Sequence, residues 1–356
     1  MGVGKSPALL QAVSDLLLFG ETERVLILAP KRVAQSTWPG EIQKFKSSFG
    51  HMSLAVAIGD ANTRHAAIRS GAQITTCNFE NLVWLVENYG ESWPFTMIIV
   101  DEATRISGLR VSIQTSKLGK KFLTGQGGSR AKALARVALS RTTRFVCLSG
   151  TPAPNGLEQL WGQYFFLDTG LRLGTSFTGF SQRWFRTIPG ADAHSGRIEP
   201  LPYADEQIRA AIKDITIAIE AKDHFDLPPL IENIIKVELP PAARKQYKEM
   251  EKELFTWIQE NPIEAFNAGT KAQKLLQIAS GAAYTDDKGN WALVHDAKMD
   301  ALESVIEEAA GMPVLVFYHF KSDLARILKA FPKAVHLGDD PKIIDHWNAG
   351  KIQMLV

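Results

Sequence analysis

The stretch MIIVDEAT, residues 97–104, carries the pattern on which the fold depends. Four apolar residues in succession lead directly into two adjacent carboxylates, Asp101 and Glu102. A run that is apolar at every position is typical of a strand buried on both faces, as in a parallel sheet covered by helices. In open sheets of this kind, ligands bind beyond the carboxyl ends of the strands. The pattern therefore predicts that both carboxylates lie at a ligand-binding edge.

Four further apolar runs resemble this one: VLILAP (25–30), LAVAIG (54–59), ITTCNF (74–79) and RFVCLSG (144–150). The segments between the runs have helical spacing, as in PALLQAVSDLLLF (7–19) and STWPGEIQKFKSSF (36–49). Strands that alternate with helices predict an α/β fold, in which helices cover both faces of a parallel sheet.

The chain changes character after Asn155. Residues 156–185 are rich in aromatic side chains with helical spacing, and residues 188–203 read as a loop or a small hairpin. A strand is predicted at 232–240 and an amphipathic helix at 241–260, and a second α/β unit begins at VLVFYHF (314–320). It continues with a helix from 321, a strand at 334–338, a helix from 343 and a strand at 352–356. These patterns predict a first lobe at 1–165, a helical or irregular insertion at 166–230, and a second lobe at 231–356.

The composition is that of an ordinary soluble protein, with 45% hydrophobic and 22% charged residues. No apolar stretch approaches the roughly 18 residues that a membrane span needs, and the start of the chain lacks a secretory signal pattern. Two cysteines, Cys77 and Cys147, lie in apolar runs, which predicts buried reduced thiols rather than a disulfide or a metal site. We expect a protein that is not secreted and works in the cytoplasm of a bacterial or phage-infected cell, or in a nucleus.

One segment has a pronounced charge bias. Between Ala103 and Leu157 there is no Asp or Glu, although the stretch contains several cations. These are Arg105, Arg110, Lys117, Lys120, Lys121, Arg130, Lys132, Arg136, Arg141 and Arg144. A basic block of this kind favours binding to phosphates, while a solvated helix face is the alternative interpretation.

The chain opens with GVGKS, residues 2–6, which matches the second half of the phosphate-binding loop G-x-x-x-x-G-K-[ST]. In that interpretation Lys5 neutralises the β- and γ-phosphates of ATP, and the Ser6 hydroxyl binds Mg²⁺. The backbone N–H groups of Val3, Gly4 and Lys5 would bind phosphate oxygens at a helix N-terminus, and Gly2 would belong to the same ATP-binding turn. The alternative is a chance glycine–lysine pair, because the first half of the loop would precede Met1.

Two other stretches add to this chemistry. In a phosphate-loop ATPase, the aspartate at such a strand end binds Mg²⁺ and the next acid activates water, which predicts Asp101 as metal ligand and Glu102 as base. The alternative is a solvated acidic turn. In LSGTPAPN (148–155), Ser149, Gly150 and Thr151 could link the nucleotide to lobe orientation by bonding the carboxylate pair. The alternative there is an ordinary turn after a strand.

Taken in order, these motifs resemble those of superfamily-two helicases (DEAD/H-like), and in particular the Swi/Snf-type DNA translocases. Two details favour the Swi/Snf type. Pro30 ends the apolar run 25–30 and is followed by Trp38 and Glu41, and the segments LEQLWGQYFFL and FTGFSQRWF follow LSGTP. Gln246 and Tyr247 in the following helix, Lys298, and the VLVF strand at 314–317 match later features of the family. Thr104 departs from the histidine that the family has after D-E-A.

The resemblance implies two RecA-like P-loop lobes, ATP and Mg²⁺ as cofactors, and double-stranded DNA bound through its backbone. By position, Lys31, Arg32, Thr76 and Asn78 would contact nucleic-acid phosphates. We expect an ATPase that translocates along DNA, present here as a fragment truncated at both ends with weak or no hydrolysis. The alternatives are a nucleic-acid-binding module that has lost the motor, and the motor part of a restriction or nuclease system. The sequence identifies no protein partner.

Overall fold

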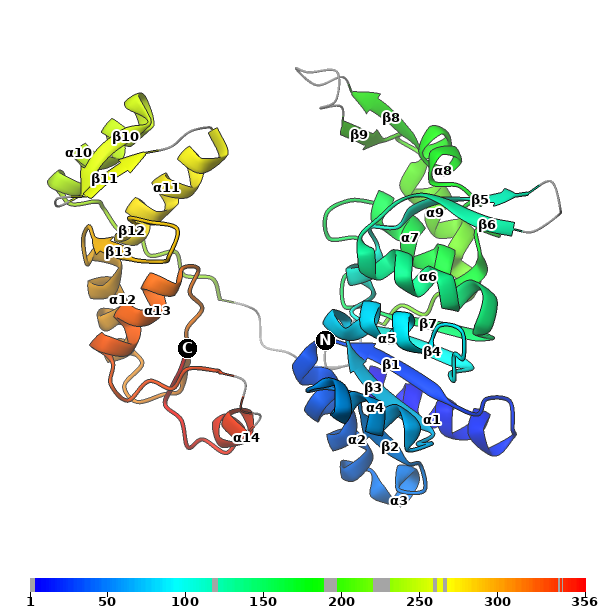
Figure 1. Ribbon diagram of the computed structural model, residues 1–356. Coiled ribbons are helices and arrows are strands. Elements are labelled where there is room, and N and C mark those ends of the chain that lie inside the picture. The colour runs from blue at the N-terminus through cyan, green and yellow to red at the C-terminus, as the bar shows by residue number, and fades with distance from the viewer. Residues whose placement is uncertain are drawn as a thin grey trace. The chain divides into compact units, whose positions relative to one another are not determined.

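The computed structural model describes residues 4–116, 121–188, 197–219, 231–258, 261–264, 268–338, 340 and 342–356. The chain forms two compact units, Met1–Leu227 (unit 1) and Pro228–Val356 (unit 2) (Figure 1). Unit 1 includes both the predicted first lobe and the elements of the predicted 166–230 insertion. The division into three parts stays a prediction.

Unit 1 is built on a five-stranded parallel sheet with the order β2-β3-β1-β4-β7. The strands are β1 (Val25–Ala29), β2 (Leu54–Val56), β3 (Ile74–Asn78), β4 (Met97–Asp101) and β7 (Arg144–Leu148). Each of the five predicted apolar runs contains one of them. In the central register, Leu28 of β1 lies opposite Cys77 of β3 on one side and Val100 of β4 on the other. The predicted α/β class is confirmed, and the sheet with its flanking helices fits a RecA-like lobe.

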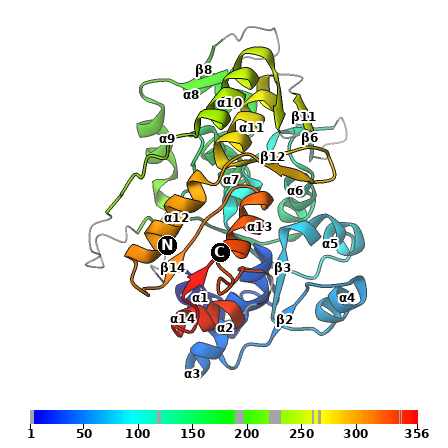
Figure 2. The ribbon, with the colours of Figure 1, turned by 90° about the vertical axis from the view of Figure 1, so that its left-hand side faces the viewer.

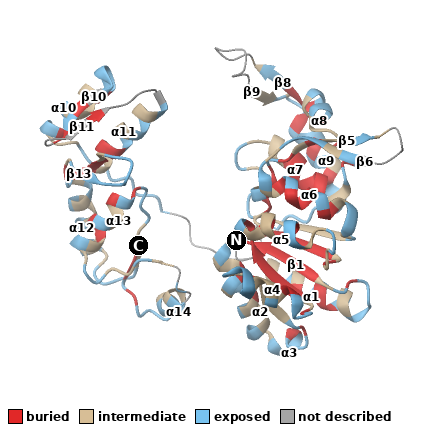
Figure 3. Ribbon diagram, viewed as in Figure 1, coloured by how far each residue is buried: buried red, intermediate tan, exposed pale blue. Residues whose placement is uncertain are grey.

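Alternate residues of the central strands pack into two apolar clusters, one on each face of the sheet. Ile27 and Ile99 pack with the helices of one face, which are α1 (Lys5–Leu18), α2 (Trp38–Lys44) and α3 (Lys46–Phe49). Leu28 and Val100 pack with those of the other face, which include α5 (Leu82–Tyr89), α6 (Ser129–Arg141) and α7 (Glu158–Asp168). All side chains of β1 are fully buried (Figure 3). Because burial of one aliphatic side chain is worth about 1.5–3 kcal/mol, this packing holds the strands and the sheet edge firmly.

Unit 1 also contains shorter helices and two antiparallel hairpins. The helices are η1 (Val33–Thr37), η2 (Phe79–Asn81), η3 (Ala103–Ile106), η4 (Lys213–Ile215), α4 (Ala61–Arg69), α8 (Phe177–Trp184) and α9 (Ala204–Ile212). Of these, α4 packs against the edge strand β2 (Figure 2). The hairpins pair β5 (Arg110–Thr115) with β6 (Lys121–Gln126), and β8 (Phe185–Ile188) with β9 (Arg197–Pro200). The helical character predicted for 156–185 is confirmed for 158–168 and 177–184. Of the loop or small hairpin predicted at 188–203, the structure describes the pairing of β9 with β8, and β8 begins three residues earlier, at Phe185.

Unit 2 consists mainly of helices and small hairpins. The helices are α10 (Pro241–Glu253), α11 (Ala268–Ser280), α12 (Ala297–Glu308), α13 (Lys321–Ala330) and α14 (Lys342–Asn348). The antiparallel pairs are β10 (Phe255–Ile258) with β11 (Asn261–Glu264), and β12 (Ala282–Tyr284) with β13 (Trp291–Leu293). One parallel pair joins β14 (Val314–Leu315) to β15 (Met354–Leu355), and Val335 adds a single bridge to Leu355. Across the described residues of both units, no helix combines the length and apolar character needed to cross a membrane.

Three sequence predictions for unit 2 are wrong. The strand predicted at 334–338 is reduced to the single bridge at Val335. The described residues 231–240 form no strand, and Ile231 and Ile234 are exposed. Their β-prone sequence has no partner strand among the described residues, and a strand needs one to satisfy its backbone. The helix predicted for 241–260 ends at Glu253, because Leu254 adopts a left-handed conformation (φ 59°) and β10 begins directly after it.

Both cysteines are free and lie in separate strands, Cys77 in β3 and Cys147 in β7. Burial raises the pKa of each thiol to about 12. A thiol with such a pKa forms almost no thiolate at neutral pH, so neither cysteine is a nucleophile.

Candidate nucleotide site

The candidate site lies at the carboxyl edge of the unit 1 sheet. The parallel strands β1, β4 and β7 all end at this edge, and Asp101 lies directly opposite Leu148, the residue before Ser149. Helix α1 precedes β1 and packs on the sheet through Leu10 and Val13. Because a helix that leads into a strand and packs along it runs in the opposite direction, its first turn returns to the carboxyl edge. The fold therefore brings Lys5 and Ser6 to the side of the sheet where Asp101 and Glu102 end β4.

The Asp101 carboxylate is held by a buried tryptophan. The indole Nε1–H of Trp38 donates a hydrogen bond to Asp101 Oδ2 at 3.2 Å, and the Trp38 side chain is fully buried. Side chains alternate along a strand, so Asp101 lies on the same face of β4 as Met97 and Ile99, the face that packs against α1 and α2. The Asp101 carboxylate is therefore on the sheet face that also carries α1.

The charges around Asp101 indicate that a cation would be bound favourably at this position. Burial raises the pKa of Asp101, and the negative charge of Glu102 raises it further, while the Trp38 hydrogen bond and the positive charge of Lys5 lower it. Lys5 is therefore near enough to act on the carboxylate electrostatically. A half-buried carboxylate beside a second acid gains from a nearby cation, so a divalent ion would relieve the repulsion here.

The donor set is of the kind that Mg²⁺ takes when it is bound with a nucleotide. Among the described residues, no group of three or more His, Cys, Asp or Glu side chains could hold a metal alone. Mg²⁺ is usually bound by one or two protein oxygen ligands together with substrate phosphates and water. One carboxylate (Asp101), one hydroxyl (Ser6) and one lysine for the phosphates (Lys5) therefore fit a magnesium–triphosphate better than a metal site made of protein alone.

Glu102 has an uncommon backbone conformation. Its φ is 64° and its ψ is 59°, in the left-handed region, and it directly precedes η3. A residue with a Cβ atom pays about 1–2 kcal/mol for this conformation. Such outliers cluster at functional sites, where the surrounding structure holds them. The strained position coincides with the residue that the sequence predicts as the base.

The turn before α1 is described only from Gly4. Gly4 has φ 77° and a backbone carbonyl that accepts from the Ala8 N–H at 3.1 Å, which begins the helix. A Cβ atom at Gly4 would meet nothing within 4 Å, so the left-handed conformation, and not lack of space, favours glycine here. Gly2 and Val3, predicted as phosphate-binding residues, lie outside the described residues.

The motif after β7 differs from its prediction. In the described residues, Ser149 and Thr151 form no hydrogen bond to Asp101 or Glu102; the Thr151 N–H donates to Ser149 Oγ at 3.2 Å. Gly150 and Thr151 are exposed. The three residues thus form a local turn beside the site, and the predicted link to the carboxylate pair is absent from this conformation.

The four predicted nucleic-acid contacts fall into two pairs. Lys31 and Arg32 follow β1 at the carboxyl edge, where Lys31 is exposed and Arg32 is half-buried. Thr76 is fully buried, and its hydroxyl donates to the Ala34 carbonyl at 2.7 Å. Asn78 is 5% exposed. Its amide donates to Glu80 at 2.8 Å, and its oxygen accepts from Asn81 at 2.6 Å. The structure therefore does not support Thr76 and Asn78 as phosphate contacts.

The basic stretch 103–157 is partly neutralised by acids from elsewhere in the sequence. Arg130 pairs with Glu80 at 3.4 Å and Arg141 pairs with Glu91 at 3.1 Å, while Arg144 pairs with Glu21. Arg110 donates to the Ser107 carbonyl at 2.6 Å and lies over the Phe177 ring. A stretch without acids in sequence is therefore not a continuous cationic surface in the fold. No sequence signal could have shown these long-range pairs, and the Trp38 hydrogen bond was missed for the same reason.

The fold and site define an α/β protein whose parallel sheet carries a cluster of one lysine and two acids at its carboxyl edge. This chain belongs to the same family as protein p41 of Acyrthosiphon pisum secondary endosymbiont phage 1. The two are 48% identical over 357 residues, which cover 100% of this chain and 75% of p41. No family model matches the chain.

More distant similarities extend to larger proteins. The chain is 23% identical over 293 residues to Protein CHROMATIN REMODELING 5 of Arabidopsis thaliana, which covers 77% of this chain and 14% of that protein. It is 24% identical over 180 residues to the DNA excision repair protein ERCC-6-like of Mus musculus, which covers 49% of this chain and 13% of that protein. Among solved structures, the Pyrococcus furiosus Hef helicase domain is similar over 97% of this chain and 84% of its own, with 11% identity. Its TM-score of 0.27 is too low for structural conclusions.

Proposed function

We propose that this protein is the motor core of an ATP-dependent nucleic-acid translocase or helicase of superfamily two, with Swi/Snf-type motifs. One observation carries the proposal: α1 packs on the face of the parallel sheet that carries Asp101, and its first turn, with Lys5 and Ser6, lies toward the carboxyl edge where β4 ends, although these residues lie far apart in sequence. The distant similarity to CHROMATIN REMODELING 5 and to ERCC-6-like proteins supports it independently.

Each residue of the site has a distinct part in the proposed chemistry. Asp101 and Ser6 would hold Mg²⁺, which supplies positive charge to the terminal phosphates when bound. Lys5 would neutralise the phosphates from the start of α1, where the helix dipole also favours anions. Glu102 would orient the attacking water and accept its proton. Trp38 would keep the Asp101 carboxylate turned toward the start of α1.

DNA is the polymer that the similarities favour, since the name of the ERCC-6-like protein refers to DNA excision repair and that of CHROMATIN REMODELING 5 refers to chromatin. Lys31 lies exposed at the same edge as the nucleotide residues. Contacts from such residues to the phosphate backbone position a protein without reading sequence. We propose that Lys31 and Arg32 contact the backbone of duplex DNA, and that Thr76 and Asn78 serve the fold.

An ATPase assay on the protein at its natural length, with and without duplex DNA, tests this function. Lys5→Ala and Glu102→Gln should each lower the DNA-stimulated rate at least about a hundredfold, the scale of loss for a general base or a key phosphate-binding cation. Matched controls exist on exposed helix surfaces: Lys46→Ala on α3 and Glu87→Gln on α5 remove the same charges and should leave the rate unchanged.

The outcomes separate the proposed functions. Equal rates in the wild type and in both site variants would refute the site. Duplex binding without any nucleotide hydrolysis in the wild type would instead favour a nucleic-acid-binding module that has lost its motor. Stimulation by single-stranded DNA or RNA alone would keep the ATPase and refute the duplex substrate.

A further inference from the structure

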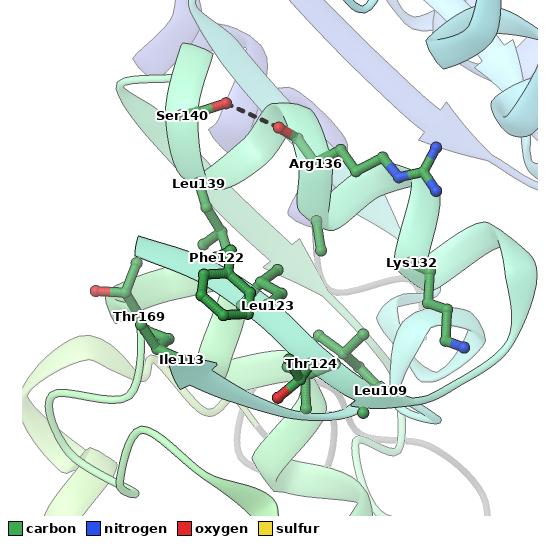
Figure 4. Close-up of a pocket in the computed structure, with 13 residues that line it drawn as sticks. Leu109, Ile113, Phe122, Leu123, Thr124, Lys132, Arg136, Leu139, Ser140 and Thr169 are labelled. Atoms are coloured by element: carbon green, nitrogen blue, oxygen red, sulfur yellow. Dashed lines mark hydrogen bonds between the residues drawn. The ribbon is translucent and has the colours of Figure 1, made fainter. Parts of the chain in front are cut away.

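Unit 1 contains a hollow whose lining residues differ from those of the candidate nucleotide site. It has a volume of about 760 Å³ and lies between the β5–β6 hairpin and α6 (Figure 4). Ligand pockets for small molecules commonly measure about 300–1,000 Å³. Except for Thr169, the residues that line it belong to the basic stretch 103–157, whose excess charge the nucleotide site does not explain.

The floor and one side of this hollow are apolar. Leu109 and Val111 are buried beneath it, and Ile113 follows Val111 on the same face of β5. Leu139 of α6 lies above Phe122 and Leu123 of β6 (Figure 4). Phe122 is 47% exposed although it is a large apolar side chain, so its ring remains accessible to a ligand.

The other side of the hollow carries positive charge. Lys132 and Arg136 lie one helical turn apart on α6, on the same stripe as Ala135 and Leu139, and both point to the side opposite Phe122 (Figure 4). Both are exposed, and neither side chain has an ion pair or hydrogen bond within the described part of the chain. The described residues that line the hollow include no carboxylate; Asp168, next to the lining residue Thr169, is bonded to Arg172 at 3.0 Å.

We infer that this hollow binds a small amphipathic anion, a ligand with an apolar or aromatic body and one carboxylate, sulfonate or phosphate group. The apolar body would lie against Phe122, Leu123 and Leu139, and the anionic group would lie between Lys132 and Arg136. The arrangement suits such a ligand better than nucleic acid. A DNA backbone needs a row of cations and gains nothing from an aliphatic floor.

A matched pair of fluorescent probes tests this inference without any use of ATP. The anionic probe is 8-anilinonaphthalene-1-sulfonate, and N-phenyl-1-naphthylamine has the same rings without the sulfonate. The double variant Lys132→Gln/Arg136→Gln should weaken saturable binding of the anionic probe about tenfold, because two partly screened charge contacts are lost. Binding of the neutral probe should stay within about twofold of the wild type. Because both replaced side chains are exposed, the fold should be retained.

Two further variants complete the experiment. Arg141→Gln removes the same charge from the same helix, outside the hollow and paired with Glu91, and should change neither affinity. Leu139→Glu places a carboxylate in the apolar wall and should weaken both probes about tenfold or more. Unchanged binding of the anionic probe in Lys132→Gln/Arg136→Gln would overturn the inference. So would a loss of duplex-oligonucleotide affinity in that variant with the probe unaffected, since the two cations would then belong to the nucleic-acid surface.

Discussion

Unit 1 and unit 2 are each stabilised internally by a different kind of contact. In unit 1 the central strand β1 is fully buried, and its side chains join apolar clusters on both faces of a five-stranded sheet. In unit 2 the only parallel pair among the described strands is β14–β15. Leu315 in β14 is 45% exposed, and Phe317, two residues later, is 88% exposed. Among the described residues of unit 2, Arg326 is the most buried charged group; it is 6% exposed and donates to the carbonyls of Ser280 and His295. Unit 1 therefore depends mainly on apolar packing on both faces of a sheet, and unit 2 depends more on polar contacts.

Shortening one strand side chain to alanine in each unit tests this contrast most strongly. Ile27→Ala in β1 should destabilise unit 1 by about 4 kcal/mol, because it opens a cavity in a close-packed core. Leu315→Ala in β14 should cost less than about 1 kcal/mol, because that side chain is nearly half exposed. Hydrogen exchange measured by mass spectrometry would report each unit separately. Equal losses in the two units would refute the contrast.

Arg326 tests whether unit 2 depends on polar contacts. It donates to the Ser280 carbonyl at 2.8 Å, the His295 carbonyl at 2.7 Å and Asp296 Oδ1 at 2.9 Å. Arg326→Met keeps the apolar stem but leaves buried carbonyls unpaired, so it should cost about 3 kcal/mol in unit 2. Exchange in unit 1 should stay unchanged. Arg209→Met, an exposed arginine paired with Asp205, is the matched control and should cost little. A neutral effect of Arg326→Met would show that the apolar contacts of unit 2 suffice.

Trp38→Phe removes the donor to Asp101 while an aromatic ring remains. A hydrogen bond to a charged group is worth about 1.5–3 kcal/mol. The free energy of unfolding of the variant should therefore be about 2 kcal/mol lower than that of the wild type at neutral pH. The folded-state pKa of Asp101 is raised above its unfolded value. The carboxylate therefore becomes protonated, and the lost bond matters less, as the pH falls through this raised pKa. Denaturation at several pH values would show this. A loss independent of pH would indicate packing alone.

The stability of unit 2 should also depend on pH, through the protonation of His295. Burial lowers the pKa of His295, whose ring nitrogen bonds the Ile278 carbonyl at 3.0 Å. Because the folded state binds this proton less readily than the unfolded state does, unit 2 should lose stability as the pH falls below about 6.5, by at most about 1.4 kcal/mol per pH unit. His295→Gln should remove this slope, and unit-resolved exchange measures it. The same slope in the variant would assign the titration to another group.

The smallest expected effect concerns Glu102. Glycine adopts the left-handed conformation freely, so Glu102→Gly should be about 1 kcal/mol more stable than Glu102→Ala. Both variants remove the carboxylate, so the comparison isolates the backbone. Thermal or chemical denaturation would measure the difference. Equal stabilities would show that Glu102 is not strained.

Much of unit 1 could be predicted from the sequence, because a strand buried on both faces leaves a continuous apolar run. The five runs named from such patterns contain the five strands of the sheet, and the acid pair after 97–100 lies at its carboxyl edge. The class of site follows from those same positions. Unit 2 was predicted less well, because β propensity at 232–240 does not reveal whether a partner strand exists.

The finer details of the site depend on contacts between residues remote in sequence. The bond from Trp38 to Asp101 joins η1–α2 to β4, and the burial of Thr76 follows from its contact with Ala34. The acids that pair with the basic stretch, such as Glu80 and Glu91, lie before it in the chain. Local pattern contains no information on such pairs, and so it overestimated both the nucleic-acid contacts and the free positive charge.

The central claim is that Lys5 and Asp101 serve one magnesium–triphosphate. Binding of a fluorescent ATP analogue in excess Mg²⁺ and then in excess chelator tests it most directly. Lys5→Ala should weaken binding in both conditions, because the lysine contacts phosphate. Asp101→Asn should weaken binding at least about tenfold in Mg²⁺ and not at all in chelator, because the carboxylate acts through the metal. Equal effects of Asp101→Asn with and without Mg²⁺, or wild-type affinity in Lys5→Ala, would contradict the claim.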